Sequence, residues 1–502
     1  MKKMTFKSRL FGSVCCLSAA LLAVSCAQGV DDETYSAGVT NQQLASPAAD
    51  AITFSYVTDA SGNEQVKVEW PVAMGAGGYE CAVENVNDPA NPETVVDNKV
   101  VDGCSLLFPS AEDTNYSVSV KTLGNEKLNN TGAESATVVA FSTMIDGVAV
   151  PEGTELGAFI SQYIADNAAD LAAKRAADPN FEIAFDLAAG ATYALDTKAD
   201  FDIQPTRLRG NMADRPQVVI GENGGLVTAA GLKVKNTNFD AAAMKQRGLI
   251  TMKKDPDESI AGPNGYVVEK PIRLEACWVK ELTRSIINCD VSAYGVKEFR
   301  ISDCIIQLNM DGSDQWLTFI NMWQNKGRFL GQDGKCWYGA ALNTIVVNST
   351  IYNRYDPSKM KDKAYFIRFA NQAIDKVFGS YNGTFDIKNS TLCRMMPNKD
   401  FGNNIANKPA YVITFSESIF YDTYRLQKVK RGGTYNWSKN YIWGVTKSVD
   451  GTDKKEIATE ADPGFTRDNL DKALDFSQPN GGVNFTPTGE AASAGDPRWI
   501  NQ

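Results

Sequence analysis

Short alternations of apolar and polar residues recur through the second half of the chain. One phrase returns between residues 272 and 421: a β-branched or aromatic residue, a polar Asn, Asp or Glu, a small Ser, Ala or Cys, and then an apolar run. Its copies are LEACWV (274–279), ISDCII (301–306), VVNSTIY (346–352), IKNSTLC (387–393) and FSESIFY (415–421), and VKNTNF (234–239) is an earlier one. Such self-similarity is typical of stacked architectures, because a single coil cannot bury its apolar face alone.

The polar position of each phrase predicts a corner of the coil. We assign it to Asn236, Glu275, Asp303, Asn348, Asn389 and Glu417. Asn and Asp tolerate left-handed backbone, and identical neighbours in a stack form hydrogen-bonded ladders. The uneven gaps between copies indicate loops inserted on one side of each coil. The phrases therefore predict a right-handed parallel β-helix over residues 180–445; the alternative is a β-sandwich whose strands share Asn-Ser turns.

A separate all-β unit is predicted at residues 51–145. Val66, Val68 and Trp70 alternate with polar residues, a glycine cluster follows, and the alternation then resumes. This stretch resembles a fibronectin type III module, in which Trp70 is the buried tryptophan of an early strand and Tyr116 is the tyrosine-corner residue. The resemblance implies the role of a spacer.

Cysteine usage leaves one pairing open. Cys81 and Cys104 both lie in this module, and an exported protein permits a disulfide between them, although sequence alone does not show that the geometry allows it. The cysteines in or beside the coil phrases, Cys277, Cys304 and Cys393, are interpreted as buried small hydrophobic residues.

A helical segment is predicted between the two β units, at residues 150–178. Thr154 is a suitable N-cap, the Asp178-Pro179 pair ends the segment, and the stretch between them is rich in alanine. Its apolar face consists of Leu156, Phe159, Ile160 and Tyr163. Stacked coils expose the open end of their core, and this helix is placed to cover it. The chain is thus predicted to be all-β: a β-sandwich, a capping helix and then the β-helix.

Composition excludes most catalytic chemistry. The chain of 502 residues contains no histidine, which rules out Ser-His-Asp and Cys-His nucleophile systems, histidine-ligated metals and histidine acid–base steps. A net charge of −10 argues against nucleic acid as the main partner. Only carboxylate, lysine, arginine or tyrosine chemistry remains, or no chemistry.

The amino end has the organisation of an export signal. A basic start at residues 2–9 precedes an apolar run at residues 10–24, which is too short to favour spanning a membrane. The run ends in AVSC, which resembles the lipobox of bacterial lipoproteins, so we expect residues 1–25 to be removed and Cys26 to be lipidated. Two or more acyl chains anchor a protein stably. The alternative is an ordinary cleavable signal with an incidental cysteine.

A polar linker is predicted over residues 26–50, because this stretch is low in aromatic residues. Its acidic run at Asp31, Asp32 and Glu33 resembles the signal that directs Bacteroidota-type lipoproteins to the outer face of the outer membrane. An ordinary solvated linker also contains such runs.

Further phrases resemble a family of Bacteroidota surface lipoproteins in which a fibronectin-like module precedes a pectate-lyase-like β-helix. TRLRGN and DRPQVVI, between residues 206 and 220, resemble an early coil, and DPGF (462–465) and GDPRW (495–499) resemble the family's endings. We expect residues 446–502 to form a C-terminal extension that packs on the β-helix. The resemblance implies a setting in polysaccharide utilisation, with outer-membrane glycan importers as partners, but the family is largely of unknown function.

No catalytic set or metal site is predicted. β-Helix enzymes that act on uronate polymers use Lys or Arg as base with acidic residues holding calcium, and hydrolases of this shape use Asp pairs. No adjacent Asp pair falls on a predicted coil, Asp303 occupies the ladder position, and Asp311 and Asp314 are better explained as a turn. We therefore expect no cofactor, apart from calcium if the protein is a lyase.

Glycan-binding candidates come from a basic run and from aromatic residues in the insertions between phrases. The basic run NRYDPSKMKDKAYFIRF contains Arg354, Lys361 and Arg368, which suit an acidic sugar. The aromatic candidates, whose rings are able to stack on pyranose rings, are Trp316, Trp323, Trp337, Tyr338, Tyr355, Trp437 and Trp443. The alternatives are a solvated basic loop and rings that pack beneath long loops.

Three functions remain open. The leading hypothesis is a non-catalytic, lipid-anchored outer-membrane protein that faces the cell exterior and binds a polysaccharide, either pectin-like or another complex glycan. The enzyme alternative is a polysaccharide lyase that acts on a uronate-containing glycan with a Lys or Arg base and calcium. The third is a structural or adhesive surface protein.

Overall fold

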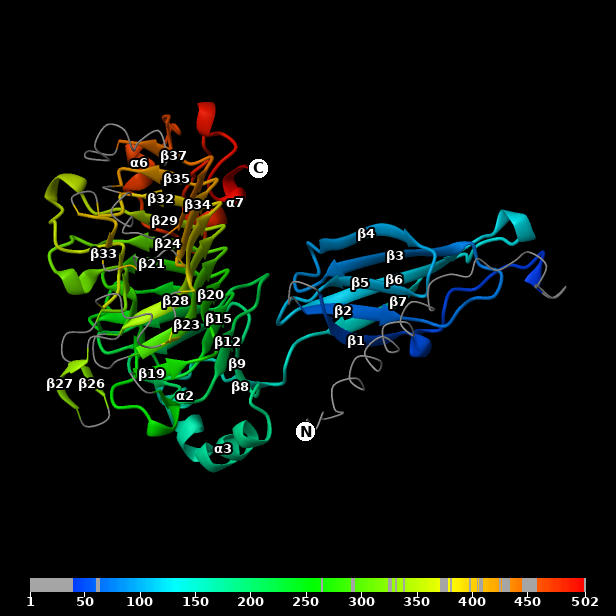
Figure 1. The fold of residues 1–502 in the computed structure, drawn as a ribbon, viewed down its shortest axis with the longest axis horizontal. Coiled ribbons are helices and arrows are strands. Elements are labelled where there is room, and N and C mark those ends of the chain that lie inside the picture. Colours follow the sequence, from blue (N-terminus) through cyan, green and yellow to red (C-terminus); the bar gives the residue numbers. More distant parts are fainter. Residues whose placement is uncertain are drawn as a thin grey trace, which may run out of the picture. The chain divides into compact units, whose positions relative to one another are not determined.

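The computed structural model describes residues 39–500 except 60–63, 263–264, 290–293, 324–326, 330–331, 337–338, 371–377, 380–381, 397–398, 404, 406–409, 424–425, 427–433 and 445–457. The chain divides into two units, Met1–Met144 and Ile145–Gln502, and each is described by itself (Figure 1). Within the described ranges no helix is both long and apolar enough to cross a membrane. The export signal and Cys26 lie outside these ranges.

The first unit is a sandwich of two antiparallel sheets. Strands β1 (Thr53–Thr58), β2 (Glu64–Glu69) and β5 (Ser105–Pro109) form one sheet in that order. Strands β4 (Glu93–Val101), β3 (Gly78–Asn85), β6 (Asn115–Leu123) and β7 (Thr137–Ser142) form the other. Every second residue of β6 is buried between the sheets, as the period-two alternation of its sequence requires.

The two predicted landmarks of this sandwich are in place. Trp70 is buried, and its ring lies edge-on to that of Tyr79 with centroids 5.3 Å apart. The Tyr116 hydroxyl accepts a hydrogen bond at 3.0 Å from a backbone N–H five residues upstream, as in a tyrosine corner. Cys81 and Cys104 are both free thiols. The fibronectin type III-like sandwich is therefore confirmed.

Among its described residues, the second unit contains three long parallel sheets (Figure 1). The twelve-stranded sheet consists of β8 (Gly147–Val150), β9 (Ile183–Leu187), β12 (Thr206–Arg209), β15 (Leu232–Lys235), β20 (Ile272–Glu275), β23 (Tyr294–Ser302), β28 (Ala340–Val347), β31 (Thr384–Lys388), β34 (Val412–Ser416), β36 (Thr434–Ser438), β18 (Ala261–Gly262) and β19 (Gly265–Val268). β19 pairs with β23, and the short β18 pairs antiparallel with β19. The ten-stranded sheet consists of β10 (Thr192–Leu195), β13 (Gln217–Ile220), β16 (Asn238–Asp240), β21 (Trp278–Leu282), β24 (Ile305–Leu308), β29 (Thr350–Asn353), β32 (Thr391–Cys393), β35 (Ile419–Tyr421), β37 (Tyr441–Trp443) and β38 (Thr459–Glu460).

The seven-stranded sheet completes the coils. It consists of β11 (Lys198–Asp200), β14 (Gly225–Thr228), β17 (Gly248–Met252), β22 (Ser285–Asn288), β25 (Ile320–Asn321), β30 (Ile367–Arg368) and β33 (Gly402–Asn403). A short antiparallel pair, β26 (Gly327–Phe329) and β27 (Gln332–Cys336), lies between β25 and β28 in the chain. From β9 to β33, each coil visits the twelve-, ten- and seven-stranded sheets in turn, as β9, β10 and β11 do first. The predicted parallel β-helix is therefore confirmed.

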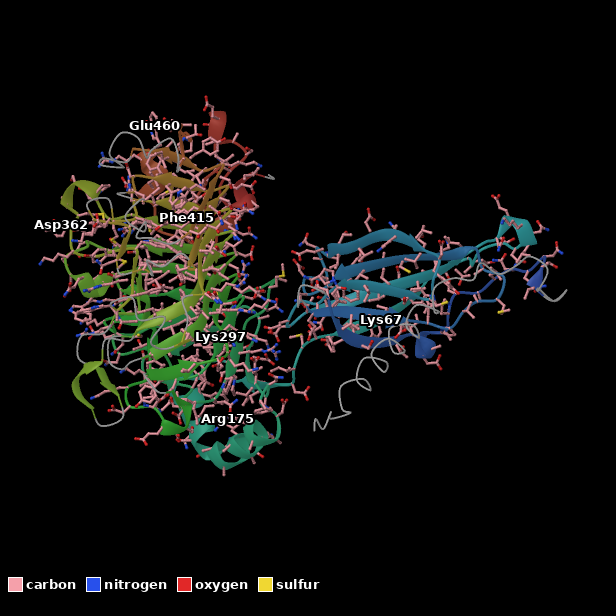
Figure 2. All side chains as sticks on the ribbon, viewed as in Figure 1. Lys67, Arg175, Lys297, Asp362, Phe415 and Glu460 are labelled. Atoms are coloured by element: carbon pink, nitrogen blue, oxygen red, sulfur yellow. The ribbon has the colours of Figure 1, made fainter. Side chains whose placement is uncertain are left out.

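Inward-pointing side chains of the three sheets form one continuous core. Along the twelve-stranded sheet the stacked residues are Leu208, Val234, Leu274, Ile301, Val346, Ile387 and Phe415. All of them are fully buried, and Phe415 is labelled in Figure 2. Burial of one such side chain contributes roughly 1.5–3 kcal/mol, so the stacked core is the main source of stability in this unit.

A left-handed residue follows successive strands of the twelve-stranded sheet from β15 to β36 and turns the chain toward the ten-stranded sheet. These residues, with φ between 46° and 56°, are Asn236, Ala276, Asp303, Asn348, Asn389, Glu417 and Lys439. The expected corner at Glu275 is wrong by one residue, because Glu275 ends β20 in register with Ser302 and Ala276 makes the turn. The Glu275 side chain instead pairs with Lys235 at 3.1 Å.

The ladder between neighbouring corners continues one residue beyond the left-handed position. Asn348 Nδ2 donates to Asp303 Oδ1 at 3.2 Å. In the following position, the N–H of Ser349 donates to Ser390 Oγ at 3.3 Å, and the N–H of Ser390 donates to Ser418 Oγ at 3.2 Å. The hydroxyls of Ser349, Ser390 and Ser418 each donate to the carbonyl two residues earlier in the chain, at 2.7–2.8 Å. The small residue of the phrase therefore joins one coil to the next.

Two helices, rather than the single one expected, follow β8 and cover the first coil. They are α2 (Leu156–Asp166) and α3 (Ala168–Ala177). The Asn167 side chain donates to the Tyr163 carbonyl at 2.8 Å, which ends α2 there. The N-cap is Glu155 and not Thr154, because the Glu155 carboxylate accepts from the backbone N–H three residues later at 2.5 Å. The buried α2 side chains Leu156, Ile160 and Ile164 join the β-helix core, as capping requires.

Residues 461–500 follow β38 and form an extension that covers the outer face of the ten-stranded sheet. Its helices are α6 (Arg467–Leu470) and α7 (Pro497–Ile500). Its buried side chains include Phe465, Leu470, Phe485 and Trp499, which cluster with Trp278, Ile305, Tyr352, Cys393 and Ile419 of the sheet. Trp499 Nε1 donates to Thr350 Oγ1 at 2.7 Å, and that hydroxyl donates to Asp496 at 2.8 Å. The outer face from β21 to β35 is thus occupied by the chain itself.

We expect Ser390→Val to destabilise the β-helix. The substitution removes the acceptor of the Ser349 N–H from a fully buried position, at an expected cost of about 1–3 kcal/mol. The control Ser438→Val changes an exposed position of β36 and should alter stability by less than about 0.5 kcal/mol. Urea unfolding followed by tryptophan fluorescence measures both, and equal midpoints would contradict the role given to the serine ladder.

Candidate functional site

The outer face of the seven-stranded sheet carries a column of polar side chains. Its strands repeat a triplet that ends in a polar residue: LIT (249–251), IIN (286–288), FIN (319–321), FIR (366–368) and FGN (401–403). Because alternate residues of a strand point to opposite faces, the middle residue faces the core and the polar residue points outward. Strand register places Thr251, Asn288, Asn321, Arg368 and Asn403 opposite one another. These five residues are the outer column.

Asn321 and Arg368, neighbours in the outer column, contain buried polar atoms without a hydrogen-bond partner in the described part of the structure. The Asn321 side chain is fully buried, and neither its Nδ2 nor its Oδ1 has a partner there. Arg368 is 7% exposed, and its Nε and Nη1 have none there either. An unsatisfied buried polar group costs about 1–3 kcal/mol and is rare in native structures. Their occurrence on adjacent strands makes this part of the sheet a candidate ligand site.

Aromatic rings and cations surround Arg368. Its guanidinium carbon lies 3.6 Å from the ring centroid of Trp323 and 5.8 Å from that of Tyr365. The Trp323 ring lies 4.8 Å from that of Trp316. An arginine and a lysine lie over the other two rings, 5.2 Å from the Trp316 centroid and 5.0 Å from the Tyr365 centroid. The cation–aromatic cluster consists of Arg247, Trp316, Trp323, Tyr365, Arg368 and Lys399.

The electrostatics of the cluster favour an anionic or hydroxyl-rich ligand. Burial lowers the pKa of Arg368 to about 10, against the opposing effects of Tyr365 and Asp314. Arg368 therefore remains a cation at neutral pH. Its guanidinium lies close to the Trp323 ring, while two of its nitrogens have no acceptor among the described residues. A carboxylate or a pair of neighbouring hydroxyls matches this planar set of donors.

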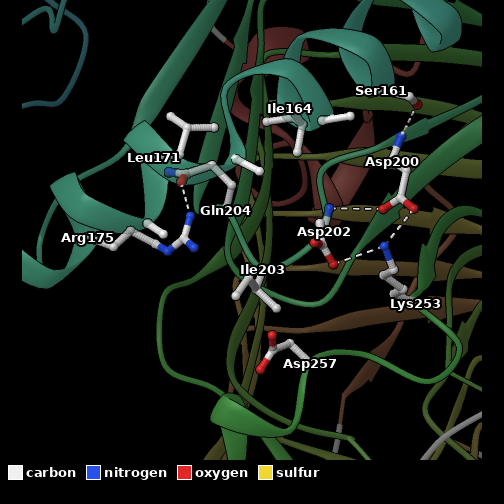
Figure 3. A pocket seen from close by; sticks show the side chains of 13 residues that line it. Ser161, Ile164, Leu171, Arg175, Asp200, Asp202, Ile203, Gln204, Lys253 and Asp257 are labelled. Carbon is white, nitrogen blue, oxygen red and sulfur yellow. Dashed lines mark hydrogen bonds and ion pairs between the residues drawn. The ribbon is translucent and has the colours of Figure 1, made fainter.

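A pocket of about 360 Å³ lies at the first-coil end of the same sheet (Figure 3). Helices α2 and α3 provide one wall, and the strand ends and loops around Asp200 and Lys253 provide the other. Asp200 ends β11 in register with Val227, which in turn lies opposite Thr251 of the outer column. We call this space the cap pocket. The cap pocket therefore lies in line with the outer column, at the first-coil end of the seven-stranded sheet.

Lys253 is paired with two carboxylates in the cap pocket. Lys253 Nζ lies 2.9 Å from a carboxylate oxygen of Asp200 and 2.9 Å from one of Asp202. Burial acts to lower the pKa of Lys253, but hydrogen bonds to the two carboxylates outweigh it and raise the pKa. Arg175 Nη1 donates to Gln204 Oε1 at 2.5 Å. Across the described residues, no group of three or more Asp, Glu or Cys side chains is arranged to hold a metal ion.

The structure brings three of the sequence candidates together. Trp316, Trp323 and Arg368 all belong to the cation–aromatic cluster. Arg354 does not belong to this cluster. It forms an ion pair with Glu281 at 2.6 Å.

The remaining candidates lie elsewhere. Lys361 is exposed and Tyr355 half-buried on the connection between β29 and β30. Trp437 lies in β36 and not in an insertion, and its ring packs on Phe415 with centroids 4.7 Å apart. Trp443 ends β37 and is half-buried. Trp337, Tyr338 and Cys26 lie outside the described residues.

Sequence analysis overlooked most of the outer column and the whole cap pocket. The triplets that produce the column were a usable signal, because Asn288, Asn321 and Arg368 each directly follow an isoleucine between two coil phrases. β25 and β30 contain only two residues each, which is too short for a periodicity to stand out. Asp200 and Lys253 belong to different coils, and nothing in the sequence between them indicates contact.

Comparisons with known families give no activity. Residues 2–190 match the model of a domain of unknown function, DUF4992, and residues 191–329 match that of another domain of unknown function, DUF4957. No curated protein matches the chain.

Several solved structures match the chain at low similarity. The fn3 domain of the human collagen alpha-1(XX) chain has 19% identity and a TM-score of 0.17, covering 22% of this chain and 96% of its own. The catalytic domain of GH87 alpha-1,3-glucanase in complex with nigerose has 10% identity and a TM-score of 0.23, covering 82% and 84%. A pectate lyase from Pectobacterium carotovorum has 11% identity and a TM-score of 0.16, covering 79% and 87%.

We expect Arg368→Met to leave stability within about 1 kcal/mol of the original protein. The variant loses the contact with Trp323, worth about 1–2 kcal/mol, but it also removes two buried donors without partners. The control Arg207→Met breaks a buried ion pair with Glu182 at 2.6 Å and should destabilise by at least about 2 kcal/mol. Urea midpoints compare the two variants. An equally large loss in Arg368→Met would make Arg368 a structural residue.

Proposed function

We propose that this protein is a cell-surface lipoprotein that binds a polysaccharide, without cleaving it, along the outer face of the seven-stranded sheet. The observation that carries the proposal is a pair of buried side chains on adjacent strands, Asn321 and Arg368, whose polar atoms lack partners within the described ranges. Arg368 also lies against the Trp323 ring. Glycans have apolar C–H faces and many hydroxyls, so they suit a site that combines rings with unsatisfied donors and acceptors.

Charge supports an acidic glycan at this part of the face. The cation–aromatic cluster contains three cations, and Asp314 is the carboxylate that acts on Arg368. A uronate carboxylate would accept hydrogen bonds from the Arg368 nitrogens. We therefore favour a pectin-like or other uronate-containing polysaccharide.

The placement outside the cell rests on the sequence. Lipidation at Cys26 would anchor the chain in the outer membrane, and residues 26–50 would connect the anchor to the sandwich. The fibronectin-like unit would act as a spacer that holds the β-helix away from the lipid surface. The partners in this proposal are the glycan itself and outer-membrane proteins that import it.

Affinity measurements on the soluble protein lacking residues 1–26 test glycan binding. Pectins, hemicelluloses and host glycans form the panel, and we expect retention of an acidic member in affinity gels. Arg368→Gln should weaken that binding at least about tenfold, equivalent to about 1.4 kcal/mol. The control Arg300→Gln, on the twelve-stranded sheet, should bind like the original protein. Failure to bind any glycan, or equal weakening in both variants, would count against the proposal.

One observation favours the lyase alternative. A buried arginine whose pKa is lowered to about 10 is easier to deprotonate than an exposed one, as a base in uronate elimination must be. If Arg368 is that base, activity on polygalacturonate with calcium should rise with pH by roughly tenfold per unit up to about pH 10. Absorbance of the unsaturated uronate product measures it.

If that absorbance appears, two variants test whether Arg368 is the catalytic base. Arg368→Ala should abolish the signal, whereas Lys361→Ala, at an exposed loop position, should retain it. No absorbance at any pH would leave binding as the better account.

A further inference from the structure

The cap pocket has one apolar wall and one polar wall. Ile164 and Leu171 form the floor of the helical wall, and the small side chains Ala165, Ala168 and Ala172 leave space in front of it. The three alanines are themselves exposed. The space therefore depends on small residues at these positions and not on a missing contact in the core.

The polar wall offers both donors and acceptors of hydrogen bonds. Asp200 and Asp202 present carboxylate oxygens around Lys253, and Arg175 lies beside Gln204 (Figure 3). With Asp257 also lining the pocket, carboxylates outnumber cations there. An anionic ligand is therefore disfavoured.

These walls match a neutral sugar ring. A pyranose has apolar C–H faces and a rim of hydroxyls that both donate and accept, which corresponds to the alanine wall and the Asp–Lys–Gln wall. The volume of about 360 Å³ is at the small end of the range for ligand sites, which suits a single unit better than a polymer segment. The lining residues include no aromatic side chain, so recognition would depend on hydrogen bonds and not on stacking.

The position of the cap pocket points to a chain end. β11 is the first strand of the seven-stranded sheet, and α2 packs on β10 and β11, so the outer face ends at the two helices. Arg368, in β30, is five strands away from β11 in the sheet order. At about 4.8 Å per strand this separation is about 24 Å, within reach of a short oligosaccharide laid across the strands.

We infer that the cap pocket binds a neutral monosaccharide unit at the end of the glycan whose acidic units lie at the cation–aromatic cluster. The inference rests on the proposed function and adds the orientation and the end-group chemistry of the ligand. The glycan would cross the seven-stranded sheet with its neutral terminus at α2 and α3.

Saturation-transfer NMR with free monosaccharides tests the pocket without a polymer. The probes are neutral hexoses, N-acetylhexosamines and uronic acids, used with the soluble protein lacking residues 1–26. We expect saturation transfer from the protein to at least one neutral sugar. This transfer should be lost in Ala172→Leu, because the larger side chain fills the pocket from α3. The control Ala173→Leu changes the next residue of the same helix, which does not line the pocket, and should retain the transfer. No transfer to a neutral sugar, or equal transfer in both variants, would overturn the inference.

Oligosaccharide affinity separates this inference from the proposed function. For an acidic chain with a neutral terminal unit, Ala172→Leu should lower affinity about fivefold or more, while a chain without that unit should bind both alanine variants equally. If Arg368→Gln weakens binding and Ala172→Leu does not, glycan binding along the seven-stranded sheet is supported and the inference about the cap pocket is wrong. If the neutral sugar binds in the pocket but no polymer is bound, the proposed function fails instead.

Discussion

The β-helix depends on one local constraint: the chain must turn at an equivalent place in every coil. A left-handed residue followed by a small one provides this turn, and serine hydroxyls bond one corner to the next. Parallel pairing then stays in register from β15 to β36, so equivalent side chains stack about 4.8 Å apart. The same stacking produces the shared core and the outward columns. A shift of one residue in strand register would turn the core residues outward and the outward residues into the core, because alternate residues point to opposite faces.

The outer faces of the three sheets differ in how their polar atoms are satisfied. The extension covers the ten-stranded sheet. On the twelve-stranded sheet, the cations stacked in register are Arg207, Lys233, Arg273 and Arg300. Glu182 pairs with the first two and Glu298 with the last two at 2.6–3.1 Å, which offsets the repulsion between like charges. On the seven-stranded sheet, Asn321 and Arg368 retain atoms without a partner in the described part of the structure, and Arg368 lies against the Trp323 ring.

That face is also asymmetric along its length. One part combines rings with cations around Arg368, and the first-coil end combines carboxylates, Lys253 and small apolar side chains. A ligand whose two ends differ in charge would bind such a face in one orientation, because reversing it would place an acidic group beside Asp200 and Asp202. The buried donors reduce the stability of the empty protein, and their satisfaction by a ligand would restore it.

Features that depend on local backbone geometry were predictable from the sequence alone. The corner phrases predict the coil, and Tyr116 predicts the tyrosine corner of the sandwich. The phrases place one turn at Glu275 instead of Ala276, and the helical pattern gives no sign of the break at Asn167. Only the tertiary structure brought Trp323 to Arg368 and Asp200 to Lys253. These residues belong to different coils, and they meet because parallel strands in register return the chain to the same face one or two coils later.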